Sequence, residues 1–270
     1  MDILERCIES CRRQPGTVAF PDSLDPRVLD AAAQLKREGL AEPVLVQSPF
    51  AVRSKLRESA LRTAGFVVVD HASPSLVARN AEMYAAIRKE AGKPITDAQA
   101  LETVACPLAA GAMMVRRGEV EVGVAGNLST TAAVLRAGLS VIPKKTGIKT
   151  ISSFFLMVSP DFERQFVFAD CAVVPEPTAE ALADIAIASA NQARNLLKQE
   201  PRVALLSFST KGSAQHPRAE TVRQAVEFVR ARATQQKLHR ELQIDSAVAP
   251  DVAAHNAPAE WVLTGDRDAL

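Results

Sequence analysis

Short apolar segments alternate with longer segments of helical periodicity along most of the chain, and this alternation limits the fold more than any other feature. Four apolar segments stand between helical ones: TVAF, PVLVQ, FVVVD and VEVGVAG, at residues 17–20, 43–47, 66–70 and 120–126. Short, continuously apolar strands between helices are typical of a parallel sheet that helices cover on both faces. The sequence therefore predicts an α/β fold built in three layers.

Local signals place the ends of several helices. Asp25 is a good N-cap, Pro26 suits the first helical position, and Gly39 suits the residue just after a helix end. The long helical stretch 96–118 contains Pro107, which lacks a backbone N–H. We therefore expect a break in that stretch near the proline.

The pattern changes after about residue 143. Two β-rich runs, 150–159 and 164–170, are separated by the polar segment PDFE, which indicates a hairpin or two adjacent strands. Helix and strand then alternate again, with elements expected at 178–197, 202–208, 217–233, 241–245 and 251–257. A boundary within 143–148 would give two α/β domains, 1–145 and 146–258, followed by a tail, 259–270.

Charge and cysteine content argue against several classes of function. Lysine and arginine number 32 against 31 acidic residues, so the net charge of +1 does not favour a nucleic acid or a membrane surface as partner. The sequence has no run of about 18 apolar residues, and its N-terminus is not typical of a secretion signal. The four cysteines form no CxxC motif and no zinc-type cluster. We therefore expect a cytoplasmic protein that needs no metal.

Three loops at expected strand ends carry groups that suit a small anion, and ligands of open α/β sheets bind at that edge. In the first loop, AGNLSTTAAVLR at 125–136, Ser129 and Thr130 precede a helix whose N–H groups and dipole favour negative charge. Arg136 follows on the same helix. The alternative is that Ser129 or Thr130 only caps the helix.

The second loop follows the strand expected at 202–208. Ser207, Ser209, Thr210 and Lys211 offer hydroxyls and an ammonium group beside a glycine, and a cation in such a loop suits phosphate. The alternative is an ordinary turn between strand and helix, in which serine, threonine and glycine are common.

The third loop, at 20–28, places Arg27 in the first turn of a helix. Arg88 lies on a later helical segment, and either arginine taken alone is typical of a solvated surface residue. The sequence contains no GxGxxG fingerprint and no P-loop, so a dinucleotide or nucleoside triphosphate site has no support. The occurrence of three such loops together indicates an anion-binding site more strongly than any one loop does.

Five segments together resemble the phosphate acetyltransferase family: SFSTKGSAQHP, FADCAVVPEPT, AGNLSTTAAVLRAG, FPDSLDPRVLDAA and ELQIDSAVAPDVAAHNAP. The motif AGNLS…VLRAG is most similar to that of the ethanolamine-utilisation type, and this similarity suggests association with a bacterial microcompartment. The resemblance implies two α/β domains with a cleft between them, similar to the isocitrate and isopropylmalate dehydrogenases, and it implies a homodimer.

The resemblance also implies an activity, the reversible transfer of acetyl between coenzyme A and inorganic phosphate. Acetyl-CoA, coenzyme A, phosphate and acetyl phosphate are then substrates, and no cofactor is bound permanently. By motif, the two phosphate-side arginines fall on Arg88 and Arg136, and the arginine for the CoA phosphate falls on Arg27. The resemblance also implies a serine with a catalytic role in a cleft loop, which falls here on Ser129. The substrate-binding residues of the cleft loops fall on Thr130, Ser207, Ser209, Thr210 and Lys211.

One family motif has no counterpart in the sequence. A late Asp-Leu-Ser-Arg-Gly motif supplies the carboxylate that takes the thiol proton, but the motif-by-motif match stops at Pro258, and the tail 259–270 is unmatched. We therefore expect an enzyme truncated at the C-terminus, with an incomplete first domain. The alternatives are an inactive remnant that binds phosphate or coenzyme A, and a transferase for butyryl or propionyl groups. A dehydrogenase would share only the fold.

Overall fold

The computed structural model describes residues 2–57, 61, 65–144, 148–160, 164–208 and 215–232, together with the backbone of 237–242. The chain divides into two compact units, Met1–Pro143 and Lys144–Leu270. Each unit is described by itself.

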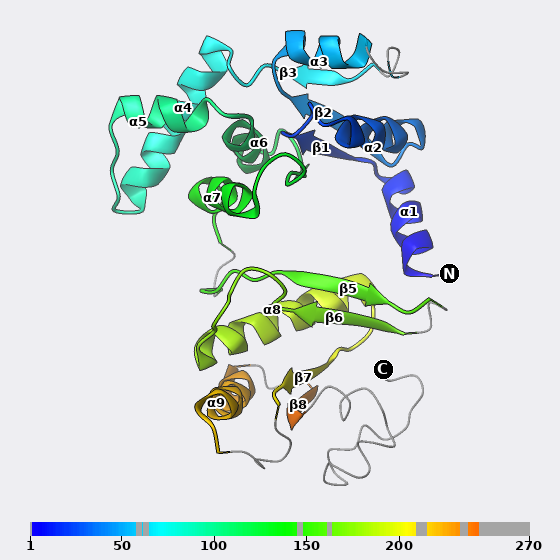
Figure 1. The fold of residues 1–270 in the computed structure, drawn as a ribbon, viewed down its shortest axis with the longest axis vertical. Helices are drawn as coiled ribbons and strands as arrows, with labels where there is room; N and C mark the ends of the chain where they lie inside the picture. The colour runs from blue at the N-terminus through cyan, green and yellow to red at the C-terminus, as the bar shows by residue number, and fades with distance from the viewer. Residues whose placement is uncertain are drawn as a thin grey trace. The chain divides into compact units, whose positions relative to one another are not determined.

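The first unit is built on a parallel sheet with strand order β3-β2-β1-β4 (Figure 1). Its strands are β1 Gly16–Phe20, β2 Ala41–Val46, β3 Val67–Val69 and β4 Val122–Gly123. β1 pairs with β2 on one side and with β4 on the other, so the strand that begins the sheet in sequence lies inside it. The parallel sheet predicted from the apolar segments is confirmed.

Seven helices are described in the first unit: α1 Ile3–Arg13, α2 Pro26–Arg37, α3 Pro49–Arg57, α4 Pro74–Glu90, α5 Asp97–Val104, α6 Pro107–Arg116 and α7 Thr131–Val141. The predicted ends of α2 are confirmed, because Asp25 is its N-cap and Gly39 has a φ of +66°. The break predicted at Pro107 is also confirmed, since that residue begins α6.

Helices cover both faces of this sheet. Successive side chains of a strand point to opposite faces, so neighbouring residues of one strand pack against different helices. On one face Phe20 and Leu45 pack with Leu29 of α2 and Val52 of α3. On the other face the neighbouring strand residues pack against α6: Ala19, Val44 and Val46 contact Ala110 and Met114. The three-layer arrangement predicted for this part of the chain follows from these two clusters.

Close packing of α6 brings it against the loop that follows β1. A Cβ atom added to Gly111 of α6 would lie 2.9 Å from Cγ of Pro21. That distance is shorter than side chains tolerate, so a glycine is needed where the helix passes the loop. The loop that carries Asp22 therefore lies against a rigid helix.

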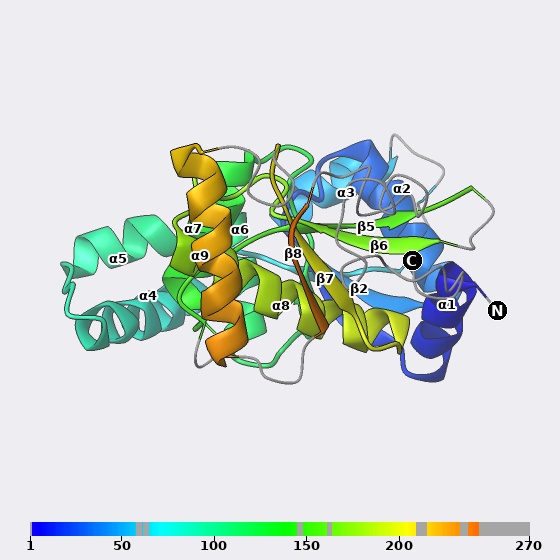
Figure 2. The same ribbon diagram turned by 90° about the horizontal axis from the view of Figure 1, so that it is seen from below.

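The second unit contains an antiparallel hairpin, a parallel pair of strands and two helices, one of which also contacts the hairpin. The hairpin strands are β5 Phe154–Val158 and β6 Gln165–Ala169, so the predicted hairpin is confirmed. α8 Ala179–Leu197 and α9 Pro217–Arg232 pack together over β7 Arg202–Leu206, through Ala183, Val226 and Leu205 among others (Figure 2).

The last described strand begins earlier than the sequence predicts. β8 is Lys237–Leu242 and pairs in parallel with β7, whereas the apolar pattern places a strand at 241–245. The prediction was wrong about where the strand begins because KLHREL is largely polar, and backbone pairing at a sheet edge does not require apolar side chains. Residues 243–245 and the expected helix 251–257 lie outside the described residues.

Within the described part of the chain, no single helix has the length and apolar composition needed to cross a membrane. The pair α5 and α6 meets that test together, but the two helices are bent by 96° with respect to each other.

Candidate functional site

The loops after β1 and β4 lie side by side at the carboxyl edge of the first sheet. The two strands are parallel neighbours, with Ala19 opposite Gly123, and the N–H of Val124 donates to the carbonyl of Ala19 at 2.9 Å. This is the edge at which open α/β sheets bind ligands. Two of the three loops predicted to suit an anion therefore lie next to each other.

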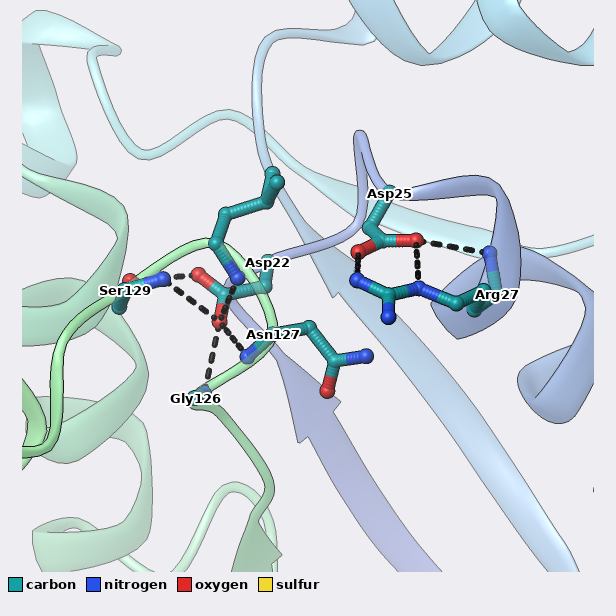
Figure 3. Close-up of polar contacts among 7 residues, drawn as sticks. Asp22, Asp25, Arg27, Gly126, Asn127 and Ser129 are labelled. Atoms are coloured by element: carbon teal, nitrogen blue, oxygen red, sulfur yellow. Dashed lines mark hydrogen bonds and ion pairs between the residues drawn. The ribbon is translucent and has the colours of Figure 1, made fainter.

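The carboxylate of Asp22 points into the loop after β4 (Figure 3). Its Oδ2 accepts from the N–H of Gly126 at 2.7 Å, of Asn127 at 2.9 Å and of Leu128 at 3.2 Å, with a longer contact of 3.4 Å from the N–H of Ser129. Its Oδ1 accepts from Oγ of Ser129 at 2.6 Å. These five donors form an anion-binding concavity, which we call the 126–129 nest.

The nest depends on a backbone conformation that favours glycine. Gly126 has a φ of +120°, which lies outside the range that other residues readily adopt. This conformation lets the successive N–H groups converge on one point. The N–H groups at the start of α7 thus converge as the sequence pattern suggests, and the anion that accepts from them here is a carboxylate of the chain itself.

Asp22 is held in its charged form. Only 5% of the residue is exposed, and burial alone raises the pKa of a carboxyl group. The hydrogen bonds from the Ser129 hydroxyl and from the N–H groups of Gly126, Leu128 and Ser129 act against that effect and bring the Asp22 pKa below its ordinary value. The nest therefore contains a negative charge at neutral pH.

Ser129 and Thr130 have different structural roles. Ser129 donates to Asp22, whereas Thr130 is the N-cap of α7 and accepts from the N–H of Ala133 at 3.2 Å. The helix-cap alternative therefore holds for Thr130. Arg136, six residues further along the chain on α7, is exposed, and no hydrogen bond or ion pair joins it to another described residue.

Arg27 is fixed by the carboxylate that caps its own helix. Asp25 accepts from the N–H of Arg27 at 2.8 Å, from its Nε at 3.1 Å and from its Nη2 at 2.6 Å (Figure 3). The hydrogen bond from Arg27 is the main cause that lowers the Asp25 pKa, and the pair raises the pKa of Arg27. Among the described residues Nη1 has no partner, and the arginine side chain is 74% exposed.

Arg88 lies in the last turn of α4 and is half-buried. Its Nε is buried and has no hydrogen-bond partner among the described residues. A buried donor without a partner is rare, because desolvation of a charged group is costly. Arg88 is therefore an arginine whose hydrogen-bonding capacity is incompletely used.

The second unit contains another carboxylate that accepts many hydrogen bonds. Asp170, directly after β6, accepts from the N–H and Oγ of Ser153 at 2.8 and 2.5 Å, and from the N–H of Val173 and Val174 at 3.1 and 2.5 Å. Burial opposes these bonds, but the hydrogen bonds from Ser153 and from the following turn hold the Asp170 pKa far below its ordinary value. The sequence analysis assigned no role to this residue.

The predicted loop after β7 is described only at its beginning. Ser207 follows β7, is half-buried and already interacts with another group of the protein. Ser209, Thr210 and Lys211 lie outside the described residues, so their substrate-binding roles stay predictions. Within the described ranges, no group of three histidine, cysteine, aspartate or glutamate side chains is arranged to hold a metal ion.

Comparison with known proteins finds one family model that matches residues 2–268, described as Phosphate acetyl/butaryl transferase. This match includes residues 259–268, which the motif comparison left unmatched. A phosphate acetyltransferase of Thermoanaerobacterium thermosaccharolyticum is 37% identical over 266 residues, which cover 97% of this chain and 80% of that protein.

Two solved structures are similar to this one over 95% of the chain and 77% of their own length. A phosphotransacetylase from Streptococcus pyogenes superposes with a TM-score of 0.87 at 32% identity. The EutD phosphotransacetylase from Staphylococcus aureus superposes with a TM-score of 0.81 at 29% identity. The α/β fold is therefore shared with phosphotransacetylases.

Proposed function

This chain belongs to the Phosphate acetyl/butaryl transferase family, and from that premise we propose that it transfers acetyl reversibly between coenzyme A and inorganic phosphate. The observation that carries the proposal is the family match over residues 2–268, nearly the whole chain. Acetyl-CoA and phosphate are the substrates in one direction, and acetyl phosphate and coenzyme A in the other. The proposal includes no permanently bound cofactor.

Arg88 and Arg136 are assigned to the phosphate oxygens. A planar guanidinium group donates two parallel hydrogen bonds to such oxygens. The exposed head of Arg136 and the unpartnered Nε of Arg88 support the assignment, since both can donate to a ligand. Arg27 is assigned to a phosphate of coenzyme A, and its pairing with Asp25 supports this role by fixing the orientation of the guanidinium group.

In the proposed reaction the thiolate of coenzyme A attacks the acetyl carbonyl of acetyl phosphate. The carbon–sulfur bond forms, the bond from carbon to the phosphate oxygen breaks, and phosphate leaves with the electron pair. Negative charge develops on the carbonyl oxygen and needs fixed donors. Ser207, Ser209, Thr210, Lys211 and Thr130 are assigned to that side, whereas the proton of the Ser129 hydroxyl is already donated to Asp22. The late Asp-Leu-Ser-Arg-Gly motif is not among these 270 residues, so none of them is assigned to removal of the thiol proton.

The finer description of the protein is part of the proposal. It has two α/β domains, 1–145 and 146–258, of the isocitrate and isopropylmalate dehydrogenase type, and it forms a homodimer in the cytoplasm. The ethanolamine-utilisation type, with its association to a microcompartment, is supported by the AGNLS…VLRAG wording and by the likeness to the Staphylococcus aureus protein. Light scattering on the purified chain measures the dimer directly.

Thioester formation from acetyl phosphate and coenzyme A tests the activity. We expect turnover when the purified chain is joined to a family segment that carries the late motif, and little turnover without it. Equal turnover in both forms would overturn the view that this segment is needed. Saturable binding of coenzyme A or phosphate without turnover in either form would favour a binding remnant.

The length of the acyl group is a second point that the assay can decide. The family description covers both acetyl and butyryl transfer, so competition among acetyl, propionyl and butyryl phosphate is the appropriate measurement. We expect acetyl phosphate to be preferred, as the names of the more similar relatives state for those proteins. A preference for butyryl phosphate would reassign the substrate but not the reaction.

A further inference from the structure

We propose that Asp22 is a positioning residue for acyl transfer: its carboxylate is the permanent anion of the 126–129 nest and sets the place of α7, which carries Arg136. The proposal rests on the proposed function for the reaction, but its structural part can be measured without turnover. Asp22 lies within the motif FPDSLDPRVLDAA, but it is not among the residues assigned to catalysis or to substrate binding.

Asp22 and the donors that it joins are far apart in sequence. The carboxylate of Asp22 lies on the loop after β1, and its donors are 104 to 107 residues further along the chain. No local turn can replace these bonds. They therefore fix one strand-end loop relative to another, and the glycine contact between α6 and Pro21 fixes the loop that carries the carboxylate.

Contacts at both ends hold α7 in place. At its N-terminal end the nest bound by Asp22 leads directly into the Thr130 cap. At its C-terminal end Nη1 of Arg116 donates to the carbonyl of Val141 at 2.9 Å. Arg136 lies between these two attachments. Its position thus depends in part on Asp22 and Arg116, neither of which is assigned to the substrate.

The nest itself does not bind the substrate anion, because its donors are already occupied. Its four N–H groups and the Ser129 hydroxyl already donate to Asp22. An ionised carboxylate there also repels a second anion. The phosphate group of the substrate is therefore met by Arg136 and not by the backbone of the nest, which changes the role that the sequence pattern suggested for this loop.

Two variants of Asp22 separate charge from hydrogen bonding. Asp22→Asn keeps the shape and lets the Ser129 hydroxyl accept from the new amide, but it removes the charge. Asp22→Ala removes the acceptor and leaves room for a formate ion. Asp70→Asn is the matched control, because Asp70 also follows a strand of this sheet but, among the described residues, its carboxylate accepts only from the N–H of Ala72, at 3.1 Å.

Hydrogen–deuterium exchange provides the measurement that does not require activity. In Asp22→Ala we expect exchange of the N–H groups at 126–129 to accelerate by about tenfold to a hundredfold, since they lose bonds to a charged acceptor. Added formate should restore much of the protection in Asp22→Ala and none in the wild type. Unchanged exchange in Asp22→Ala, or in Asp22→Asn if the alanine variant does not fold, would overturn the proposal.

Kinetics in the form of the protein that turns over separate positioning from general stability. We expect kcat/KM for acetyl phosphate to fall by about tenfold or more in Asp22→Ala, with the KM for coenzyme A unchanged and formate restoring part of the loss. An equal loss for both substrates without rescue would mean a merely structural role and would overturn the proposal. A wild-type chain without turnover, but with protection that depends on Asp22, would count against the proposed function instead.

Discussion

Asp22 in the first unit and Asp170 in the second unit both follow a strand and both accept several hydrogen bonds, but their donors come from different distances in sequence. Asp22 binds a loop more than a hundred residues away. Asp170 binds the turn that it begins, up to Val174, and Ser153 of the neighbouring strand end. A carboxylate that accepts from the turn it begins, as Asp170 does, determines the shape of that turn. A carboxylate that accepts from a distant loop, as Asp22 does, determines where a separate element lies, and a binding site needs such positioning.

The largest expected effect on stability is at Asp170. Asp170→Ala removes the acceptor of the Ser153 hydroxyl and of several N–H groups, so we expect the free energy of unfolding to fall by about 2–4 kcal/mol. Urea unfolding measures the change. Asp170→Asn is the control and should lose less, because the amide oxygen still accepts. A loss below about 0.5 kcal/mol, the range of ordinary surface substitutions, would contradict this account.

A double-mutant cycle compares the two carboxylates as pairs. For Asp22→Ala and Ser129→Ala we expect a coupling energy of about 1–2 kcal/mol, since the two side chains share a bond of 2.6 Å between a carboxylate and a hydroxyl. The Asp170 and Ser153 pair should couple by a similar amount. The crossed pair, Asp22 with Ser153, should show coupling near zero, and a large value there would mean that the cycle reports general loss of structure.

Acid provides a third comparison. The pKa values of both carboxyl groups are lowered in the folded protein. Their contribution to stability is therefore complete above the ordinary aspartate pKa of about 3.9 and is lost as the pH falls through the lower folded values. Unfolding free energies measured from pH 6 down to about pH 2 should fall less in Asp22→Asn than in the wild type, because the variant has no carboxylate to protonate at this position. Parallel curves would show that Asp22 does not titrate with folding.

The sequence predicts contacts that are local and misses those that depend on strand order. The caps made by Asp25 and Thr130 are recognisable because acceptor and donor lie within three residues of each other. The bond from Asp22 to the 126–129 nest depends on β1 and β4 being neighbours, and no spacing in the sequence states that. The pattern AGNLST correctly indicated converging N–H groups, but it could not indicate that the anion comes from the chain.

Smaller effects are expected at the cap of α7. Thr130→Ala removes the acceptor for the N–H of Ala133, and we expect a loss of about 1 kcal/mol in unfolding free energy. Thr130→Ser is the control and should retain most of the stability. Exchange of the N–H groups at 126–129 should change little in Thr130→Ala. If their protection were lost together with the cap, the nest would depend on the helix end rather than on Asp22.

The smallest expected effect is at Asp70, and it completes the comparison. This residue lies after β3, the edge strand of the same sheet, and within the described part of the chain its carboxylate accepts only from the N–H of Ala72 two residues away. Asparagine makes the same turn contact, so Asp70→Asn should change the unfolding free energy by less than about 0.5 kcal/mol and leave exchange at 126–129 unchanged. If Asp70→Asn changed exchange at 126–129 as much as Asp22→Asn does, any carboxylate at this edge of the sheet would stabilise α7. The electrostatic field of the edge, and not a specific hydrogen bond, would then hold the helix.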